Sequence, residues 1–333
     1  MKMTIEENIK KFAFELGADD VGICSAEDFE EIRHQIELKN DLLKGFAETD
    51  IEKRLKPSIT LRNAKSIIVL SKNYRLNNKF QYDGKIRGYI SMGAVGEDYH
   101  IYISEMLKDI SEMIEKNYNA KCVYFTDTGP LCDRAAAVRS GIGYYGKSGC
   151  VITDNAGACA FLGYIITDLN LNFDEKSNRS CGKCDLCIRS CPSGAISANG
   201  FDTTKCISYI TQLKRELSEE EMFLVGKNLY GCDVCQRVCA KNKGYVNEID
   251  DINISMPEIK EILNMSNRQF KEKYGKTAMG WRGASVIKRN ALCALLQYKN
   301  NEAEEVAYIG LKSESDLVKN TAEKVLEIMK KTR

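Results

Sequence analysis

The sequence predicts a mixed α/β chain in three parts: an α/β layer over residues 1–175, a cysteine-rich region over 176–250 and an α-helical region over 251–333. Three observations lead to this division. In the first part, strand-like apolar runs alternate with a helical pattern, which is typical of an α/β layer. Cysteine and glycine become frequent after Ser177, and from about residue 256 the apolar residues follow helical spacing. A chain of 333 residues is long enough for two or three such units.

The elements of the first part follow from local patterns. Thr4 and Glu7 form a capping-box pair that begins an amphipathic helix ending near Leu16, and Gly17 suits its C-cap. Residues 98–117 carry apolar side chains at helical spacing. Three apolar runs predict buried strands, at residues 65–72, 121–126 and 159–167.

Further helices are expected toward the C-terminus. A capping box at Ser218 and Glu221 predicts one helix inside the cysteine-rich region, ending near Asn228. Apolar stripes predict three more, at residues 284–299, 302–311 and 315–331. Short connections between such helices are typical of a small helical repeat unit, and equally of an ordinary helical subdomain.

Composition excludes several classes of protein. The formal net charge of +1 means that any nucleic-acid partner must be met by a local basic patch. No run approaches the roughly twenty apolar residues that span a bilayer, and the first residues lack the apolar core of a signal peptide, so we expect a cytoplasmic protein without membrane contact. With fourteen cysteines and only two histidines, metal or redox use is favoured over disulfides and over histidine-based zinc sites.

The most specific motif is the run CGKCDLCIRSCP at residues 181–192. Its C-x2-C-x2-C-x3-C-P spacing is that of bacterial ferredoxins, in which three cysteines bind one cluster and the fourth binds a second. Cys206 and the group GCDVCQRVC at 231–239 complete two sets of four. We therefore predict two [4Fe–4S] clusters, one held by Cys181, Cys184, Cys187 and Cys239, the other by Cys191, Cys206, Cys232 and Cys235.

A pair of four-cysteine zinc sites is the alternative, because zinc also accepts C-x2-C pairs. The run ending in Cys-Pro is far more typical of cubane clusters. The other six cysteines have no ligand spacing, and most of them lie in apolar contexts, so we expect most to be buried packing residues: Cys24, Cys122, Cys132, Cys150, Cys159 and Cys293.

A candidate site in the α/β part lies in TDTGPLCDRAAAVRSGIGYYGKSG, residues 126–149. Asp127 falls at the end of a predicted strand, where open α/β sheets bind ligands. Gly129 and Pro130 then turn the chain, and Asp133 can cap a helix. Four glycines could let the backbone approach a flat ligand, at positions 141, 143, 146 and 149. On these residues alone, Asp127 could equally be a turn or capping residue.

The order of motifs resembles the epoxyqueuosine reductase family, cobalamin-dependent iron–sulfur enzymes of queuosine biosynthesis. The resemblance runs from about Lys65 to the C-terminus, with a weaker N-terminal part. It is carried by DTGP-x-x-DR, G-x-G-x-x-GK, FLGYI-x-TDL, CGKCDLCIRSCPSGAI, KCISY and YGCDVCQRVC. It implies an α/β (α+β) cobalamin-binding layer, a ferredoxin-like double-cluster domain and a C-terminal HEAT-like repeat.

The resemblance also implies the chemistry. Electrons would pass through the two clusters to a base-off cobalamin lying between the α/β layer and the cluster domain. The epoxide of epoxyqueuosine, at the wobble position of a tRNA, would be reduced and its oxygen lost as water. Asp127 matches the family's proton donor, and a partly desolvated carboxylic acid can supply the proton that the departing oxygen needs.

Other cofactor contacts and partners are carried over in the same way. The implied cobalamin-binding residues are Arg54, Asp127, Lys147, Ser148, Val151, Ser208, Tyr209 and Asp233. Ordinary loop structure is the alternative for each. The implied partners are the anticodon stem-loop of tRNA and an electron donor such as ferredoxin or flavodoxin, and we expect a monomer.

A local basic patch could meet the tRNA. It surrounds the single Trp281 and comprises Arg268, Lys271, Lys273, Lys276, Arg282, Lys288 and Arg289. The alternative is a solvated helical face, because Glu261, Glu272 and Glu305 lie within or beside the stretch.

Two other functions stay open. One is a cobalamin and iron–sulfur reductase of a small molecule, like the reductive dehalogenases, although those usually carry a twin-arginine export signal and lack this basic tail. The other is a non-catalytic electron-transfer protein, which would leave the α/β part and Asp127 without a role.

Overall fold

The computed structural model describes residues 3–242 and 246–331. Packing divides these residues into two compact units, each built from separate stretches of the chain. Unit 1 takes residues 3–74, 99–186 and 238–242, and unit 2 takes residues 75–98, 187–237 and 246–331. This grouping reflects packing alone, and the three-part division by function stays a prediction.

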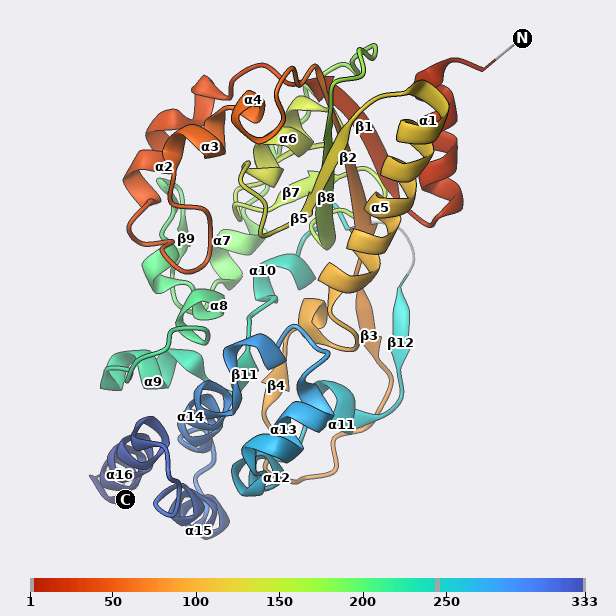
Figure 1. Cartoon of the computed structure of the whole chain (residues 1–333). Helices are drawn as coiled ribbons and strands as arrows, with labels where there is room; N and C mark the ends of the chain where they lie inside the picture. Colours follow the sequence, from red (N-terminus) through yellow and green to blue (C-terminus); the bar gives the residue numbers. More distant parts are fainter. Residues whose placement is uncertain (1–2, 243–245, 332–333) are drawn as a thin grey trace. The chain divides into compact units, whose positions relative to one another are not determined.

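Unit 1 is centred on a four-stranded sheet in the order β1-β2-β8-β5, in which every pairing is antiparallel (Figure 1). A separate antiparallel pair, β6-β7, follows helix α6. The strands are β1 (Asp20–Ser25), β2 (Ser66–Asn73), β5 (Cys122–Thr126), β6 (Gly143–Tyr145), β7 (Val151–Thr153) and β8 (Ala160–Thr167). The helices are α1 (Ile5–Glu15), η1 (Glu30–Ile32), α2 (Arg33–Lys39), α3 (Ile51–Leu55), α4 (Pro57–Thr60), α5 (Tyr99–Tyr118) and α6 (Asp133–Arg139).

The sheet is covered on both faces. Ile68 and Leu70 of β2 pack with α1 and α5, while Ile67 and Val69 point to the opposite face and pack with α6. Side chains of a strand alternate between faces, so a strand buried on both sides reads as a continuous apolar run. This is why residues 65–72 could be recognised as a strand.

Several sequence predictions for unit 1 are confirmed. The Thr4–Glu7 capping box is present at the start of α1, and α5, β2, β5 and β8 lie where they were expected. The argument that Asp127 lies where open α/β sheets bind ligands was wrong in its premise. The rule that ligands gather at the carboxyl ends of strands applies to parallel sheets, and this sheet is antiparallel, so neighbouring strands end at opposite edges.

Unit 2 contains three small two-stranded sheets and a run of helices (Figure 1). Its strands are β3 (Leu76–Asn78), β4 (Tyr89–Ile90), β9 (Ile196–Ser197), β10 (Gly200–Phe201), β11 (Asn228–Tyr230) and β12 (Asn247–Ile249). Its short helices are η2 (Met92–Ala94), α7 (Leu186–Ser190), which begins at the last residue of a unit 1 stretch, η3 (Thr203–Lys205), α8 (Ile207–Ile210), α9 (Glu219–Val225) and α10 (Val234–Arg237). The remaining helices are α11 (Ile252–Ser255), α12 (Ile259–Asn264), α13 (Asn267–Tyr274), η4 (Gly280–Arg282), α14 (Ala284–Leu295), α15 (Asn301–Gly310) and α16 (Asp316–Lys331).

Helix α14 is the centre of this helical region. It contacts α9, α12, α15 and α16, and ten of its twelve residues are buried. Two of the buried residues, Arg289 and Asn290, are polar. The Asn290 amide donates to the carbonyl oxygens of Thr211 (2.7 Å) and Leu229 (2.8 Å). The helix therefore ties the cysteine-rich stretch to the C-terminal helices. Within the described residues, no helix is long and apolar enough to cross a membrane.

Candidate functional site

Asp127 lies directly after β5, as the sequence predicted. Its backbone has a φ of 55°, in the left-handed region that a residue with a Cβ adopts only at a cost. Its side chain is 55% exposed. The Tyr99 hydroxyl donates a hydrogen bond of 2.7 Å to Oδ2 of this carboxylate, and Nε2 of His100 lies 3.8 Å from the same oxygen. The carboxylate is thus exposed but oriented.

Tyr99 is itself held in place. Its ring stacks on Phe161 of β8 with centroids 4.0 Å apart and planes 6° apart. Because Tyr99 is the first residue of α5, helix and sheet together fix the position of its hydroxyl. No sequence pattern indicates this contact, which joins residues 28 positions apart.

Asp133 is a second carboxyl group in this region. It was expected to cap a helix, but Cys132 is the N-cap of α6 and Asp133 is the first helical residue, where its Oδ1 accepts from the N–H of Arg134 at 2.7 Å. Burial and the negative charge of Asp127 raise the pKa of Asp133 to about 6, although Arg134 and Arg54 act in the opposite direction. The site therefore holds the exposed carboxyl group of Asp127 and the carboxyl group of Asp133, whose pKa is raised.

Arg54, a predicted cofactor contact, is buried on the five-residue helix α3 and is 8% exposed. Its Nη1 has no hydrogen-bond partner among the described residues. A buried guanidinium group without an acceptor is costly, and an amide or phosphate oxygen of a bound molecule would satisfy it.

The glycine-rich segment builds the β6–β7 pair. Ser148 and Val151 are buried there. A Cβ at Gly143 would lie 2.6 Å from the carbonyl oxygen of Ile152, so this glycine is required by the packing of the pair itself. Lys147, another predicted cofactor contact, donates from its ammonium group to the carbonyl oxygens of Gly182 (2.9 Å) and Cys184 (2.8 Å). It therefore holds the first turn of the cysteine run.

Three of the four cysteines predicted for the first cluster lie in unit 1. Cys181 and Cys239 pack against Tyr144, Ile152 and Ala158. Burial raises the pKa of Cys239, and the nearby Cys181 and Cys184 add to the effect. These thiols are therefore close neighbours although residues 181 and 239 are far apart in the sequence. The fourth, Cys187, is grouped with unit 2.

The four cysteines predicted for the second cluster line one cavity in unit 2, and the rest of its wall is mostly apolar. Burial raises the pKa of Cys232 to about 11, with smaller contributions from Cys206, Asp233 and Cys191. Burial would also raise the pKa of Cys191, but hydrogen bonds from Ser193 and from neighbouring backbone N–H groups lower it. A mostly apolar cavity lined by four cysteines, one of which accepts hydrogen bonds from backbone N–H groups, fits a [4Fe–4S] cube.

The predicted cobalamin contacts of unit 2 lie beside this cavity. Ser208 and Tyr209 are on α8, directly after Cys206, and are half-buried. Asp233 is 2% exposed. Its carboxylate accepts from the Tyr89 hydroxyl (2.7 Å), the Met92 N–H (2.7 Å) and Nε of Arg237 (2.9 Å). This carboxylate therefore has a structural role in fixing the cluster loop.

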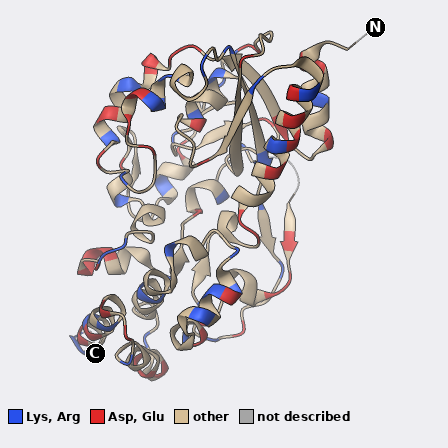
Figure 2. Cartoon of the chain, viewed as in Figure 1, with Lys and Arg blue, Asp and Glu red and all other residues tan. Residues whose placement is uncertain are grey.

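The basic patch predicted for tRNA divides into residues with different roles. Arg289 is fully buried and donates to carbonyl oxygens of residues 210–215, so its assignment to an RNA-binding surface was wrong. Lys288 donates to the Met265 carbonyl oxygen at 2.5 Å. On α13, basic and acidic residues are intermixed (Figure 2). Arg268 pairs with Glu272 at 2.8 Å and Lys273 with Glu261 at 3.5 Å, whereas Lys271 makes no ion pair with any described residue.

Comparison with known proteins identifies the family. A family model described as "Epoxyqueuosine reductase QueG" matches residues 54–128, and one described as "4Fe-4S double cluster binding domain" matches residues 180–242. An epoxyqueuosine reductase of Staphylococcus aureus is 34% identical over 96% of this chain and 87% of its own length. One of Bacillus anthracis is 37% identical over 90% of this chain and 82% of its own length. The chain belongs to the epoxyqueuosine reductase family.

Solved structures agree with the family. The epoxyqueuosine reductase of Streptococcus thermophilus is similar with a TM-score of 0.91 and 33% identity, covering 99% of this chain and 91% of that one. An epoxyqueuosine reductase with an epoxyqueuosine-modified tRNA stem loop is similar with a TM-score of 0.87 and 31% identity, over 98% of this chain and 99% of that one. The epoxyqueuosine reductase of Bacillus subtilis was solved with its catalytic loop swung out of the active site. It is similar with a TM-score of 0.90 and 32% identity, covering 98% of this chain and 90% of that one. The double-cluster domain and the mixed α/β fold predicted from the sequence are thereby confirmed.

Proposed function

We propose that this chain reduces the epoxide of epoxyqueuosine in tRNA to give queuosine, with Asp127 as the proton donor. The observation that carries the proposal is the oriented, solvent-accessible carboxylate of Asp127 at the end of β5, in a chain of the epoxyqueuosine reductase family. Reduction of an epoxide to an alkene consumes two electrons and two protons and releases the oxygen as water. The protein must therefore deliver both electrons and protons to the same substrate.

The two [4Fe–4S] clusters would carry the electrons. Cys181, Cys184, Cys187 and Cys239 would hold one, and Cys191, Cys206, Cys232 and Cys235 the other. The convergence of the last four on one cavity supports their assignment. A ferredoxin or flavodoxin is the kind of donor that could load such clusters, because both carry single electrons at low potential.

Cobalamin is the cofactor proposed to receive these electrons, and when bound it would supply a strongly reducing cobalt centre. The unsatisfied, buried Nη1 of Arg54 fits its amide or phosphate oxygens. Ser148, Val151, Ser208 and Tyr209 are further contacts that the resemblance to the family implies. The carboxylate of Asp233 and the ammonium group of Lys147 have partners within the protein, so we assign them to the support of the cluster loops.

Asp127 would donate a proton to the departing oxygen. Its exposure allows it to regain a proton from water, and Tyr99 keeps its carboxylate in one orientation. A relative solved with its catalytic loop in a swung-out position suggests that the loop after β5 can also move in this chain. The half-buried Asp133, whose pKa is about 6, could hold a second proton next to Asp127.

The tRNA would be bound through its anticodon stem-loop, as the stem-loop complex of a relative suggests. Lys271 on α13 and Trp281 on η4 are the candidates in this chain, whereas Lys273 is paired with Glu261. We further propose that α14, α15 and α16 form a HEAT-like unit, since they are consecutive helices that contact one another and are joined by short connections. A monomer in the cytoplasm stays a prediction.

Anaerobic reconstitution with iron, sulfide and cobalamin tests the proposal. We expect about eight irons per chain from two cubes, and a bound cobalamin absorption spectrum. Reduced enzyme should convert tRNA that contains epoxyqueuosine to tRNA that contains queuosine, and Asp127→Asn should lose this conversion while keeping both cofactors. Clusters without cobalamin uptake would instead favour an electron-transfer protein, and turnover of the free nucleoside but not of tRNA would favour a small-molecule reductase.

A further inference from the structure

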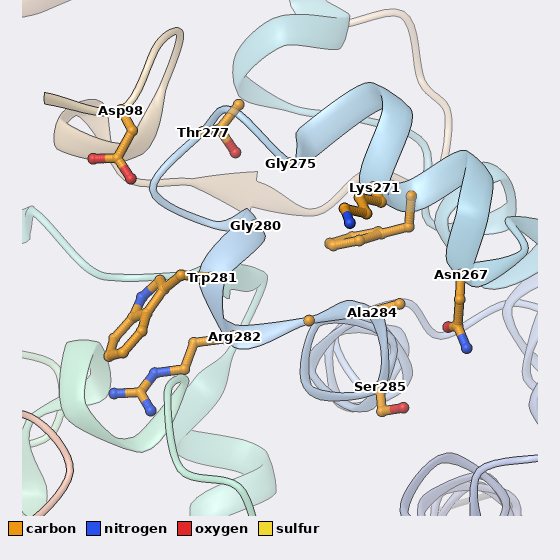
Figure 3. Close-up of a pocket in the computed structure, with 12 residues that line it drawn as sticks. Asp98, Asn267, Lys271, Gly275, Thr277, Gly280, Trp281, Arg282, Ala284 and Ser285 are labelled. Atoms are coloured by element: carbon orange, nitrogen blue, oxygen red, sulfur yellow. The ribbon is translucent and has the colours of Figure 1, made fainter. Parts of the chain in front are cut away.

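Unit 2 contains a cavity of about 500 Å³ beside the start of α14 (Figure 3). Its wall combines residues of α13, of η4 and of the first turn of α14, including Phe270, Lys271, Trp281 and Ser285. Among the described residues that line it there is no predicted cluster ligand and no predicted cobalamin contact. The volume falls within the range of small-molecule sites, roughly 300–1,000 Å³.

The aromatic part of the cavity is Trp281, the single tryptophan of the chain. The guanidinium carbon of Arg282 lies 3.5 Å from the centre of its ring. The indole N–H donates to the Tyr230 hydroxyl at 2.8 Å. The residue is nevertheless 51% exposed. The indole is thus fixed on one face and at its N–H edge while much of its surface faces solvent, which is the arrangement of an aromatic platform for a nucleic-acid base.

The charge in the cavity is uneven. Lys271 is exposed, makes no ion pair with the residues described by the structure, and extends from α13 toward Gly280 (Figure 3). The adjoining start of α14 has Gly283 as its N-cap, which provides no capping side chain, and has no acidic residue in its first turn. Its partial positive charge therefore adds to that of Lys271. Asp98 lies on the other side of Gly280 in the same view, so an anion is favoured at the Lys271 end.

We propose that this cavity binds one unpaired nucleotide of the substrate tRNA, with its base against Trp281 and its phosphate near Lys271. Asp98 would accept a hydrogen bond from an amino or hydroxyl group of the nucleotide. A paired base is stacked on both faces and cannot reach the indole, whereas an unpaired base of a loop can. The inference rests on the proposed function, because the tRNA supplies the nucleotide, and it goes further in naming the residues and the unpaired state that they select.

Binding can be measured without turnover. The holoenzyme would be titrated, under anaerobic conditions, into a fluorescently labelled anticodon stem-loop, and anisotropy would give the Kd. The comparison probes are the same loop sequence as a linear oligonucleotide, a blunt duplex of the stem, and a free nucleoside monophosphate. We expect the stem-loop and the linear loop to compete, the duplex to compete poorly, and the monophosphate to compete only at much higher concentration.

Matched variants separate this site from general charge attraction. Lys271→Ala should weaken stem-loop binding by about three- to tenfold and lower the salt dependence by about one phosphate contact. Lys273→Ala removes the same charge two residues away on the same helix, outside the cavity lining, and should change the Kd by less than about twofold. Trp281→Ala should weaken binding by about tenfold or more, and Trp281→Phe, which keeps a ring, by about threefold or less.

Ultraviolet cross-linking supplies a readout that does not depend on variants. Trypsin should release residues 277–282, TAMGWR, as one peptide. We expect this peptide to carry a cross-linked nucleotide from the loop, and competition by the linear loop to remove the cross-link.

The outcomes test the nucleotide site separately from the proposed function. Equal weakening by Lys271→Ala and Lys273→Ala, or wild-type Kd in Trp281→Ala, would overturn the nucleotide site even in an enzyme that converts epoxyqueuosine. Absence of conversion by the wild type would overturn the proposed function, and the binding comparison would still decide the inference.

Discussion

Removal of one hydroxyl group tests how Asp127 is positioned. Tyr99→Phe deletes the donor that lies 2.7 Å from Oδ2 of Asp127 but keeps the ring that stacks on Phe161. The change therefore removes the hydrogen bond to Asp127 and leaves the ring in place. Asp127 stays in place through its backbone, and its side chain loses its preferred orientation.

The size of the effect follows from the exposure of the carboxylate. A hydrogen bond to a charged group contributes about 1.5–3 kcal/mol. Because the Asp127 side chain is 55% exposed, water can replace part of this bond, and the low end of the range applies. A loss of about 1.5 kcal/mol in transition-state stabilisation lowers kcat roughly tenfold. KM for the tRNA should stay the same, because Tyr99 orients the proton donor and does not form part of the proposed RNA contacts.

The assay is single-turnover conversion of epoxyqueuosine-containing tRNA by pre-reduced holoenzyme. Because the enzyme is already reduced, the measured rate does not depend on the electron donor. Tyr118→Phe is the matched control. It lies at the other end of α5, and its hydroxyl accepts a hydrogen bond of 2.8 Å from the Asn8 amide. We expect it to keep the wild-type kcat. An unchanged kcat in Tyr99→Phe, or equal losses in both variants, would refute the positioning role.

Three further predictions concern the clusters and the second carboxyl group. Cys206→Ser should lower the iron content from about eight to about four per chain, measured after anaerobic reconstitution, whereas Cys122→Ser, outside both cysteine sets, should keep about eight. Lys147→Ala should lower the reduction potential of one cluster by tens of millivolts, on the order of 50 mV, in a spectroscopic redox titration, and the exposed Lys183→Ala should shift it less. Asp133→Asn should raise the free energy of unfolding by about 1–3 kcal/mol at about pH 8, and this gain should shrink toward about pH 5. Its raised pKa of about 6 means that the wild-type contribution is present at low pH and is lost as the pH rises through that value, so a gain independent of pH would contradict the assignment.

The sequence revealed the parts of the fold that depend on near neighbours. The capping boxes at Thr4 and at Ser218 were found because each joins residues three positions apart. Strand β1 was missed, since the short run DVGICS becomes a strand by pairing with β2, about fifty residues away. The antiparallel order of the sheet depends on the same kind of long-range pairing, and a resemblance of local patterns to α/β proteins could not reveal it.

The site was predictable to a similar degree. Cysteine spacing predicted the cluster ligands, because those intervals are typical of bacterial ferredoxins, and four of the predicted cysteines line one cavity. The contact between Tyr99 and Asp127 depends on the packing of α5 against the sheet, and no sequence pattern near either residue indicates it. For Arg289, the position predicted from charge was wrong. Charge suggested a surface residue, but its guanidinium group is satisfied by backbone carbonyl oxygens of residues 210–215, which allows full burial.

The charges beside the two cluster sites differ, and the difference bears on the direction of electron transfer. The ammonium group of Lys147 contacts the carbonyl oxygens of Gly182 and Cys184, so a positive charge adjoins the first site. At the second site the buried Asp233 follows Cys232 directly, and its charge is offset by Arg237 at 2.9 Å. Reduction adds a negative charge to a cluster, so an unopposed cation favours it more than a neutralised ion pair does. We therefore expect electrons to pass from the second cluster to the first, and Lys147→Ala to narrow the gap between their potentials.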